Sequence, residues 1–153
     1  QLDYELFTRF DVRLAYRFND VRIDYQSEQL RKPLIARHRA FLNTAYETKS
    51  GWAFDATLNW QGQKRLPNTT ANPKEYQLEA ESPNFFLLSG QVTKSWKDGL
   101  FELYLGGENL LNFRQDNPIL GSDDPFGTYF DASMVWGPIF GRNLYAGMRY
   151  KIQ

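Results

Sequence analysis

Six stretches of the chain alternate apolar and polar residues with a period of two, and this pattern restricts the fold more than any other feature. On an extended strand, such alternation places apolar and polar side chains on opposite faces of a sheet. Each stretch is about ten residues long, which exceeds the ~5–6 residues that are commonest for strands of globular proteins. The predicted strands are Arg9–Phe18, Ala36–Tyr46, Trp52–Gln61, Phe86–Trp96, Phe101–Leu111 and Arg142–Ile152.

The fourth and fifth of these strands flank Asp98-Gly99, which predicts a tight hairpin turn because a type I′ turn needs positive φ at both central residues. A register shifted by one residue would mix apolar and polar side chains on both faces, so the turn fixes the pairing. The predicted pairs are Lys97–Leu100, Trp96–Phe101, Ser95–Glu102, Lys94–Leu103, Thr93–Tyr104, Val92–Leu105, Gln91–Gly106 and Ser89–Glu108.

Short and long connections differ in their placement along the chain. Tight turns are expected at 47–51 and 97–100, and long loops at 19–35, 62–85 and 113–141, the first with strand extensions at Val21, Ile23 and Tyr25. Because consecutive antiparallel strands alternate in direction, every tight turn lies at one end of the sheet and every long loop at the other. Outer-membrane β-barrels have this asymmetry, with short periplasmic turns and long extracellular loops.

Aromatic residues near both strand ends indicate that the apolar face contacts lipid. Trp52 and Trp60 point the same way, as do Phe86 and Trp96, and these separations span roughly 20–25 Å along the membrane normal at the usual rise and tilt. Such spacing is typical of two aromatic girdles around an apolar band, with a watery lumen on the polar face. A soluble sandwich or lipocalin-like barrel is the alternative, although its strands are usually shorter and its loops less one-sided.

Composition excludes several function classes. The net charge of 0 implies no general attraction to nucleic acid, and no apolar run is long enough for a transmembrane helix. The chain has no cysteine, and its single histidine, His38, lies between two arginines away from any nucleophile motif, so we expect no enzyme and no cofactor. Asp123, Asp124 and Asp131 do not have EF-hand spacing, so we expect turn formation before Pro125 rather than a metal site.

The segment Gly106–Asn112 reads Gly-Gly-Glu-Asn-Leu-Leu-Asn and precedes a long loop and a terminal alternating strand. It resembles the C-terminal end of TonB-dependent outer-membrane receptors, whose penultimate strand commonly reads Gly-x-x-Asn-Leu-x-Asn. Further similarities to a subset of these receptors are Arg37–Arg39, Pro118–Gly121 and Asp131–Pro138. The resemblance extends over essentially the whole chain and is most specific from Gly106 onward.

In that family a barrel of 22 strands encloses an N-terminal plug. The resemblance therefore implies that residues 1–153 are the C-terminal part of such an antiparallel transmembrane β-barrel, about its last six strands, in the bacterial outer membrane. The implied partners are outer-membrane lipid, the protein's own plug, TonB through the N-terminal part, and a small-molecule ligand. That ligand is a siderophore–iron complex, cobalamin, another metal chelate or a saccharide. A passive porin or adhesin barrel is the alternative outer-membrane class.

Four arginines form the candidate ligand site: Arg13, Arg17, Arg37 and Arg39. Pairing of the first two strands is expected to place all four on the polar face, in the half nearer the long loops. Guanidinium groups bind carboxylate or phosphate in bidentate fashion, so the cluster predicts an anionic ligand. The alternative is that these arginines pair with acidic groups of the barrel or the plug.

Overall fold

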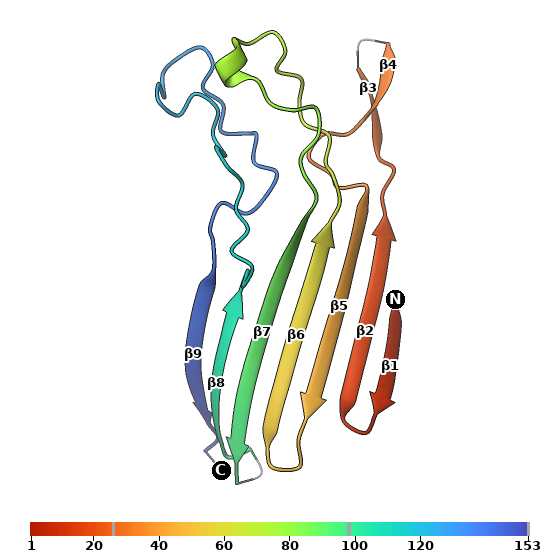
Figure 1. Ribbon diagram of the computed structural model, residues 1–153, viewed down its shortest axis with the longest axis vertical. Coiled ribbons are helices and arrows are strands. Elements are labelled where there is room, and N and C mark those ends of the chain that lie inside the picture. The colour runs from red at the N-terminus through yellow and green to blue at the C-terminus, as the bar shows by residue number, and fades with distance from the viewer. Residues whose placement is uncertain (26, 98, 153) are drawn as a thin grey trace.

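The computed structural model describes residues 1–25, 27–97 and 99–152 and is all-β (Figure 1). Its main feature is one seven-stranded antiparallel sheet in the order β1-β2-β5-β6-β7-β8-β9, and a separate hairpin pairs β3 with β4. The strands are β1 Leu2–Phe7, β2 Phe10–Phe18, β3 Arg22–Tyr25, β4 Glu28–Arg31, β5 His38–Glu47, β6 Trp52–Gln61, β7 Phe85–Trp96, β8 Phe101–Glu108 and β9 Asn143–Tyr150.

All six predicted strands are present in this sheet, but the sheet has one strand more than predicted. β1 adds a strand before the first predicted one, because Leu2 and Tyr4 continue the apolar face opposite Leu14 and Val12. The loop 19–35 contains the β3–β4 hairpin, in which Ile23 pairs with Leu30. The expected strand extension at Ile23 and Tyr25 is confirmed as part of β3, whereas Val21 precedes that strand. Within the described residues the sheet stays open, with β1 and β9 at its two edges.

The predicted register of the β7–β8 hairpin is confirmed from Trp96–Phe101 to Gln91–Gly106, and the pairing continues to Gly90–Gly107. At the turn, the Leu100 amide donates to the Lys97 carbonyl at 3.1 Å, and Gly99 has a φ of 83°. Asp98, the other predicted turn residue, lies outside the described residues. The other tight turn uses Gly51 at a φ of 80°, where an added Cβ would meet the Ser95 carbonyl oxygen at 2.6 Å.

The prediction that tight turns and long loops lie at opposite ends is confirmed. The β1–β2, β5–β6 and β7–β8 connections and the C-terminus lie at the lower end of the sheet in Figure 1, and the long connections lie at the upper end. The segment between β6 and β7 also contains a short 3₁₀ helix, η1 Lys74–Tyr76. No helix in the described part of the chain has the length and apolar character needed to cross a membrane.

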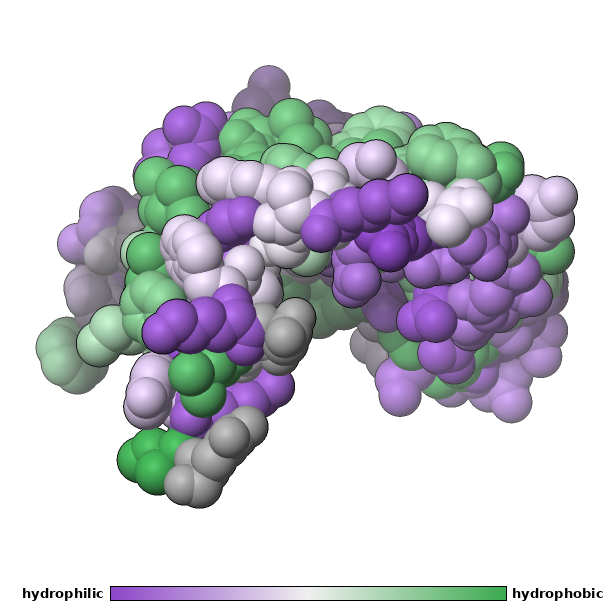
Figure 2. All heavy atoms as spheres, turned by 90° about the horizontal axis from the view of Figure 1, so that it is seen from below, coloured by the Kyte–Doolittle hydropathy of each residue, from purple (hydrophilic) through white to green (hydrophobic). Residues whose placement is uncertain are grey.

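The two faces of the sheet differ in chemistry, as alternation predicts. Side chains that share the apolar face include Leu14, Leu42, Leu58 and Leu88, which form one cross-strand row. Many large apolar side chains on this face are exposed, including Tyr16 at 59% and Leu105 at 62%. Seen from below, the sheet is curved, with hydrophobic residues mainly along its outer side and hydrophilic residues mainly on its hollowed side (Figure 2).

The buried residues lie mostly above the sheet, between the long loops, rather than on either face. Phe85 stacks on Phe113 with ring centroids 4.5 Å apart, and Trp136 packs against both rings. Gln115 is buried beside them: its amide nitrogen donates to the Met134 carbonyl at 3.0 Å, and its amide oxygen accepts from two backbone amides, those of Trp136 and Gly137. We call this packed region the loop layer; its buried apolar residues are Ala36, Leu66, Phe85, Leu120 and Met134.

Candidate functional site

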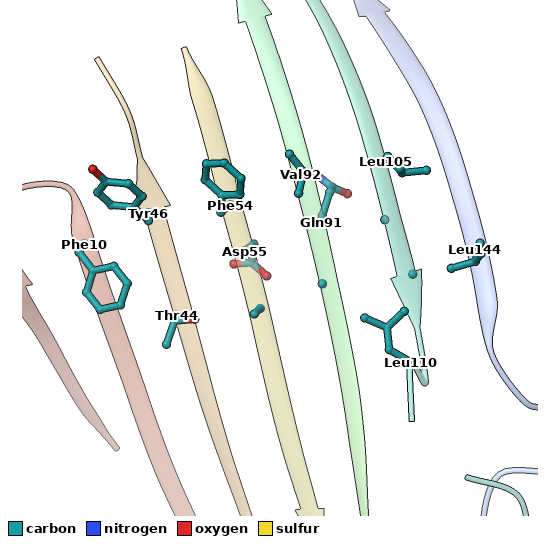
Figure 3. A pocket seen from close by; sticks show the side chains of 14 residues that line it. Phe10, Thr44, Tyr46, Phe54, Asp55, Gln91, Val92, Leu105, Leu110 and Leu144 are labelled. Carbon is teal, nitrogen blue, oxygen red and sulfur yellow. The ribbon is translucent and has the colours of Figure 1, made fainter. Parts of the chain in front are cut away.

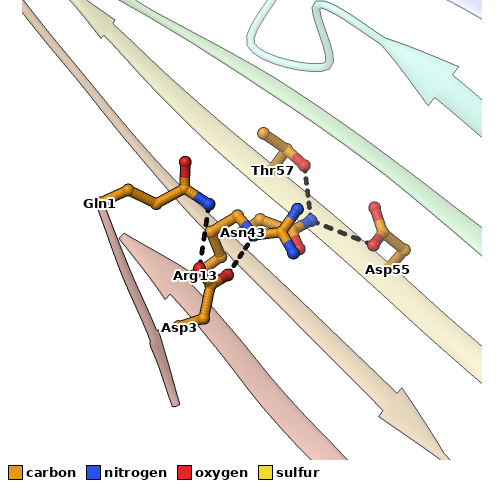
Figure 4. Close-up of polar contacts among 6 residues, drawn as sticks. All are labelled: Gln1, Asp3, Arg13, Asn43, Asp55 and Thr57. Atoms are coloured by element: carbon orange, nitrogen blue, oxygen red, sulfur yellow. Dashed lines mark hydrogen bonds and ion pairs between the residues drawn. The ribbon is translucent and has the colours of Figure 1, made fainter. Parts of the chain in front are cut away.

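Polar side chains connect neighbouring strands across the hollowed face, which we call the polar face. Arg13 on β2 forms an ion pair with Asp3 on β1, and Asp3 also accepts from Gln1 at 2.9 Å. On the next two strands, Asn43 donates to Thr57 at 2.8 Å and to Asp55 at 3.0 Å (Figure 4). Asp3, Arg13, Asn43 and Thr57 are successive cross-strand partners, so this row of polar side chains follows directly from the alternation.

Two tyrosines lie over two glycines farther along the same face. Gly106 pairs with Tyr145, and Gly147 pairs with Tyr104, across the β8–β9 ladder. A Cβ added at either glycine would collide with the ring of its tyrosine, so the absence of a side chain provides the space for the ring. The Tyr145 hydroxyl then donates to Gln91 on β7 at 3.1 Å and links three strands.

The structure separates the four arginines of the predicted ligand site. Arg17 and Arg39 lie directly opposite each other on the polar face. Arg13 lies on the same face but is paired with Asp3. Arg37 was predicted to lie on the polar face, but its guanidinium lies 5.1 Å from the ring centre of Phe18, a residue of the apolar face.

Lys64 is a cation of this region that the sequence analysis did not single out. Its ammonium donates to the Trp136 carbonyl and lies 5.7 Å from the Phe85 ring centre, so it connects the 62–85 segment to the loop layer. Burial in this contact, and to a lesser degree the charge of Arg39, lowers the pKa of Lys64. This role of Lys64 was difficult to predict, because the residue follows a predicted strand within a segment that has no alternating pattern.

His38 and Arg37 lie at the loop end of the apolar face. The Tyr16 hydroxyl and the Nδ1 atom of His38 are hydrogen-bonded at 2.6 Å, and Phe18 packs on the same imidazole with centroids 5.3 Å apart. At the opposite end, Lys94 lies over the rings of Trp52 and Trp96 at 5.2 and 5.6 Å. The apolar face is therefore bounded at both ends by aromatic residues with a cation among them.

A shallow groove of about 490 Å³ crosses the middle of the apolar face. Its floor follows the cross-strand row Thr44, Ala56, Gly90 and Gly107, where small side chains leave the backbone uncovered. Larger residues, among them Phe54, Val92 and Leu144, border it (Figure 3).

The Gly106–Asn112 motif has a structural explanation at the end of β8. Asn109 has a φ of 47° and therefore ends the strand, and the Leu110 amide then donates to the Leu88 carbonyl at 2.7 Å. The Leu110 side chain covers Gly107, where an added Cβ would meet its Cδ2 at 2.6 Å. The motif thus shapes the transition from strand to loop, and β8 ends at Glu108 rather than at the predicted Leu111.

The aspartates of the long loop serve turns and contacts within the loops. Asp131 accepts a hydrogen bond from the Ser133 amide at 2.7 Å, and Asp123 accepts one from the Tyr76 hydroxyl at 3.4 Å. The second of these bonds joins η1 to the 113–141 segment, and the rings of Tyr76 and Tyr129 also stack there with centroids 5.2 Å apart. Among the described residues, no cluster of three or more histidine, cysteine or acidic side chains is arranged to hold a metal ion.

Comparison of the chain with models of known families, with curated proteins and with solved structures found no match.

Proposed function

We propose that the chain is part of the wall of an outer-membrane transporter that imports a scarce ligand, with energy supplied through TonB. The exposed apolar face carries this proposal. A soluble protein rarely exposes a contiguous apolar surface of this extent, whereas a membrane-spanning sheet requires one. The polar face and its cross-strand hydrogen bonds suit a lumen.

The direction of the sheet in the membrane follows from the placement of its connections. Short turns belong to the periplasmic end and long loops to the extracellular end, as in other outer-membrane barrels. The packed loop layer then lies outside the cell, where an incoming ligand first meets the protein. The two free edges, β1 and β9, would pair with other strands of a larger barrel, of the 22-strand type, around a plug.

Cysteine labelling of adjacent residues tests the membrane part of the proposal. Met148 lies on the apolar face at 75% exposure, and the next residue, Arg149, lies on the polar face with its side chain 66% exposed. This part of the protein has no native cysteine. In the full-length protein in outer membranes, a water-soluble maleimide is expected to label Arg149→Cys and to leave Met148→Cys unlabelled until detergent is added.

The transport part needs a separate measurement. Uptake of candidate ligands by cells that produce the full-length protein is expected to stop when a protonophore dissipates the inner-membrane potential, while surface binding persists. Equal labelling of both cysteines in intact membranes would contradict the membrane assignment. Uptake that continues without the potential would instead indicate a passive barrel.

A further inference from the structure

Arg17 and Arg39 form an unusual cross-strand pair on the polar face. They are direct partners in the β2–β5 ladder, so their Cβ atoms are about 4.5–5.5 Å apart. Like charges in this position destabilise a sheet. In the described part of the chain four other arginines form ion pairs with acidic side chains, but neither Arg17 nor Arg39 does.

The surroundings increase the positive charge at this point instead of neutralising it. Lys64 lies at the same end of the sheet, because its backbone pairs with that of Ala36, three residues before Arg39, and the charge of Arg39 contributes to the lowered pKa of Lys64. The cross-strand partner of Arg39 on β6 is the neutral residue Gln61. The nearest hydrogen-bond partner of Arg17 is neutral: its Nε donates to the Asn19 amide oxygen at 2.9 Å. That bond holds the Arg17 side chain toward the loop end of the sheet.

On the first strands of the sheet, acidic residues of the same face lie at its other end. Glu5 lies directly opposite Asp11 near the β1–β2 turn, and Asp55 follows two strands farther along. Glu108 is an acid of this face at the loop end, but it belongs to β8, three strands away from Arg39. On β1, β2 and β6 the acids and the two arginines are therefore separated along the strands, which leaves a positive site at the loop end of β2 and β5.

We propose that Arg17 and Arg39, with Lys64 beside them, bind a carboxylate or phosphate group of the imported ligand. This inference rests on the transport function proposed above and specifies its ligand as an anion. Each guanidinium group can donate two parallel N–H hydrogen bonds to a carboxylate or a phosphate, and here two such groups lie on adjacent strands. Bound between them, the anion would also remove the repulsion that the pair otherwise carries.

Binding of anionic probes to the purified full-length protein in detergent tests the site. Citrate and inorganic phosphate serve as the carboxylate and phosphate probes, measured by isothermal titration calorimetry. At least one of them is expected to bind the unmodified protein, and the double variant Arg17→Gln/Arg39→Gln is expected to weaken that binding at least tenfold. The matched control is Arg149→Gln on the same face, whose partner is Glu102, and it is expected to leave binding unchanged.

A charge reversal separates ligand binding from a structural role. Arg39→Glu creates an opposite-charge pair with Arg17, so the heat-unfolding midpoint of the protein is expected to stay the same or rise while probe binding is lost. A lower midpoint would mean that Arg39 already pairs with an acid elsewhere in the protein, which overturns the proposal. Absence of binding for both probes, or equal binding by the double variant, also overturns it.

These outcomes are distinct from those of the transport experiment. Binding in detergent does not depend on TonB or on an energised inner membrane. Loss of energy-dependent uptake with intact citrate or phosphate binding would therefore refute transport alone. Unchanged affinity in the arginine variants, together with energy-dependent uptake, would refute the anion site alone.

Discussion

Replacing Asn109 with alanine is expected to lower the free energy of unfolding by about 2.5–6.5 kcal/mol, because this residue combines an unusual backbone conformation with three hydrogen bonds. Its φ of 47° lies in the left-handed region, which costs most residues about 1–2 kcal/mol. Its side chain accepts from the Phe113 amide at 3.0 Å and donates to the carbonyls of Phe113 and Phe140 at 2.7 and 3.2 Å. Each such bond contributes about 0.5–1.5 kcal/mol.

Two further variants separate these contributions. Asn109→Gly keeps the left-handed conformation and loses the hydrogen bonds, so it is expected to be about 1 kcal/mol more stable than Asn109→Ala. Asn109→Asp keeps an acceptor for the Phe113 amide but loses both donated bonds, so it is expected to lie between the unmodified protein and Asn109→Gly. At most other positions in a helix or strand, alanine is more stabilising than glycine.

The assay is denaturant unfolding of the full-length protein in detergent, with heat-modifiable gel mobility as an independent measure of the folded fraction. The diagnostic result is the order of glycine above alanine, since it depends on the backbone conformation alone. If Asn109→Ala is as stable as Asn109→Gly, or more stable, the left-handed explanation of this motif is wrong. If all three variants match the unmodified protein, the hydrogen-bond explanation is wrong as well.

Two other predictions concern the loop layer. Gln115→Leu keeps the side-chain volume but leaves two half-buried backbone amides and one buried carbonyl without their partner, at a cost of about 2–5 kcal/mol. Added protease is therefore expected to cut the 113–141 segment faster in intact cells if the loops face outward as proposed. Equal cutting rates would contradict this role for Gln115. The pKa of Lys64 is lowered in the folded state, so the unfolded chain binds more protons between that pKa and the ordinary lysine value. The stability of the unmodified protein is therefore expected to rise with pH in this window relative to Lys64→Met, and parallel pH curves would contradict the assignment.

The alternation of apolar and polar residues predicted six of the seven strands of the sheet, because each of these strands has one apolar face and one polar face. The missing strand, Leu2–Phe7, shows where this signal fails: the strand is short, and it joins β2 through Arg9, which adopts a φ of 69° without the glycine or asparagine that marks such a turn. The end of β8 was misplaced for a related reason, since Leu110 and Leu111 look like a continuing strand although Asn109 has already ended it.

The predicted arginine site shows that sequence periodicity predicts which residues face each other but not all of the contacts that their side chains make. The prediction that Arg17 and Arg39 lie on the same face of adjacent strands is confirmed, because the periodic pattern of each strand determines which residues share a face. The partner of Arg13 could not be found without β1, and Arg37 turned toward Phe18 because it precedes β5 and is not held by the strand's alternation. Lys64 reaches Trp136 through a contact between residues far apart in sequence, which no local pattern reveals.

With the membrane orientation proposed above, the packed loop layer would also determine how antibodies recognise this protein. Leu120, Met134 and Gln115 are buried, and the chain on either side of them is fixed by long-range contacts. An antibody raised against a synthetic 113–141 peptide would therefore reach the part of its epitope that contains these buried residues only in unfolded protein. The exposed run 122–126, in which the Phe126 side chain is fully exposed, offers a linear epitope in the folded protein. Antibodies against folded protein would also bind residues brought together from the 62–85 and 113–141 segments, such as Tyr76 and Tyr129.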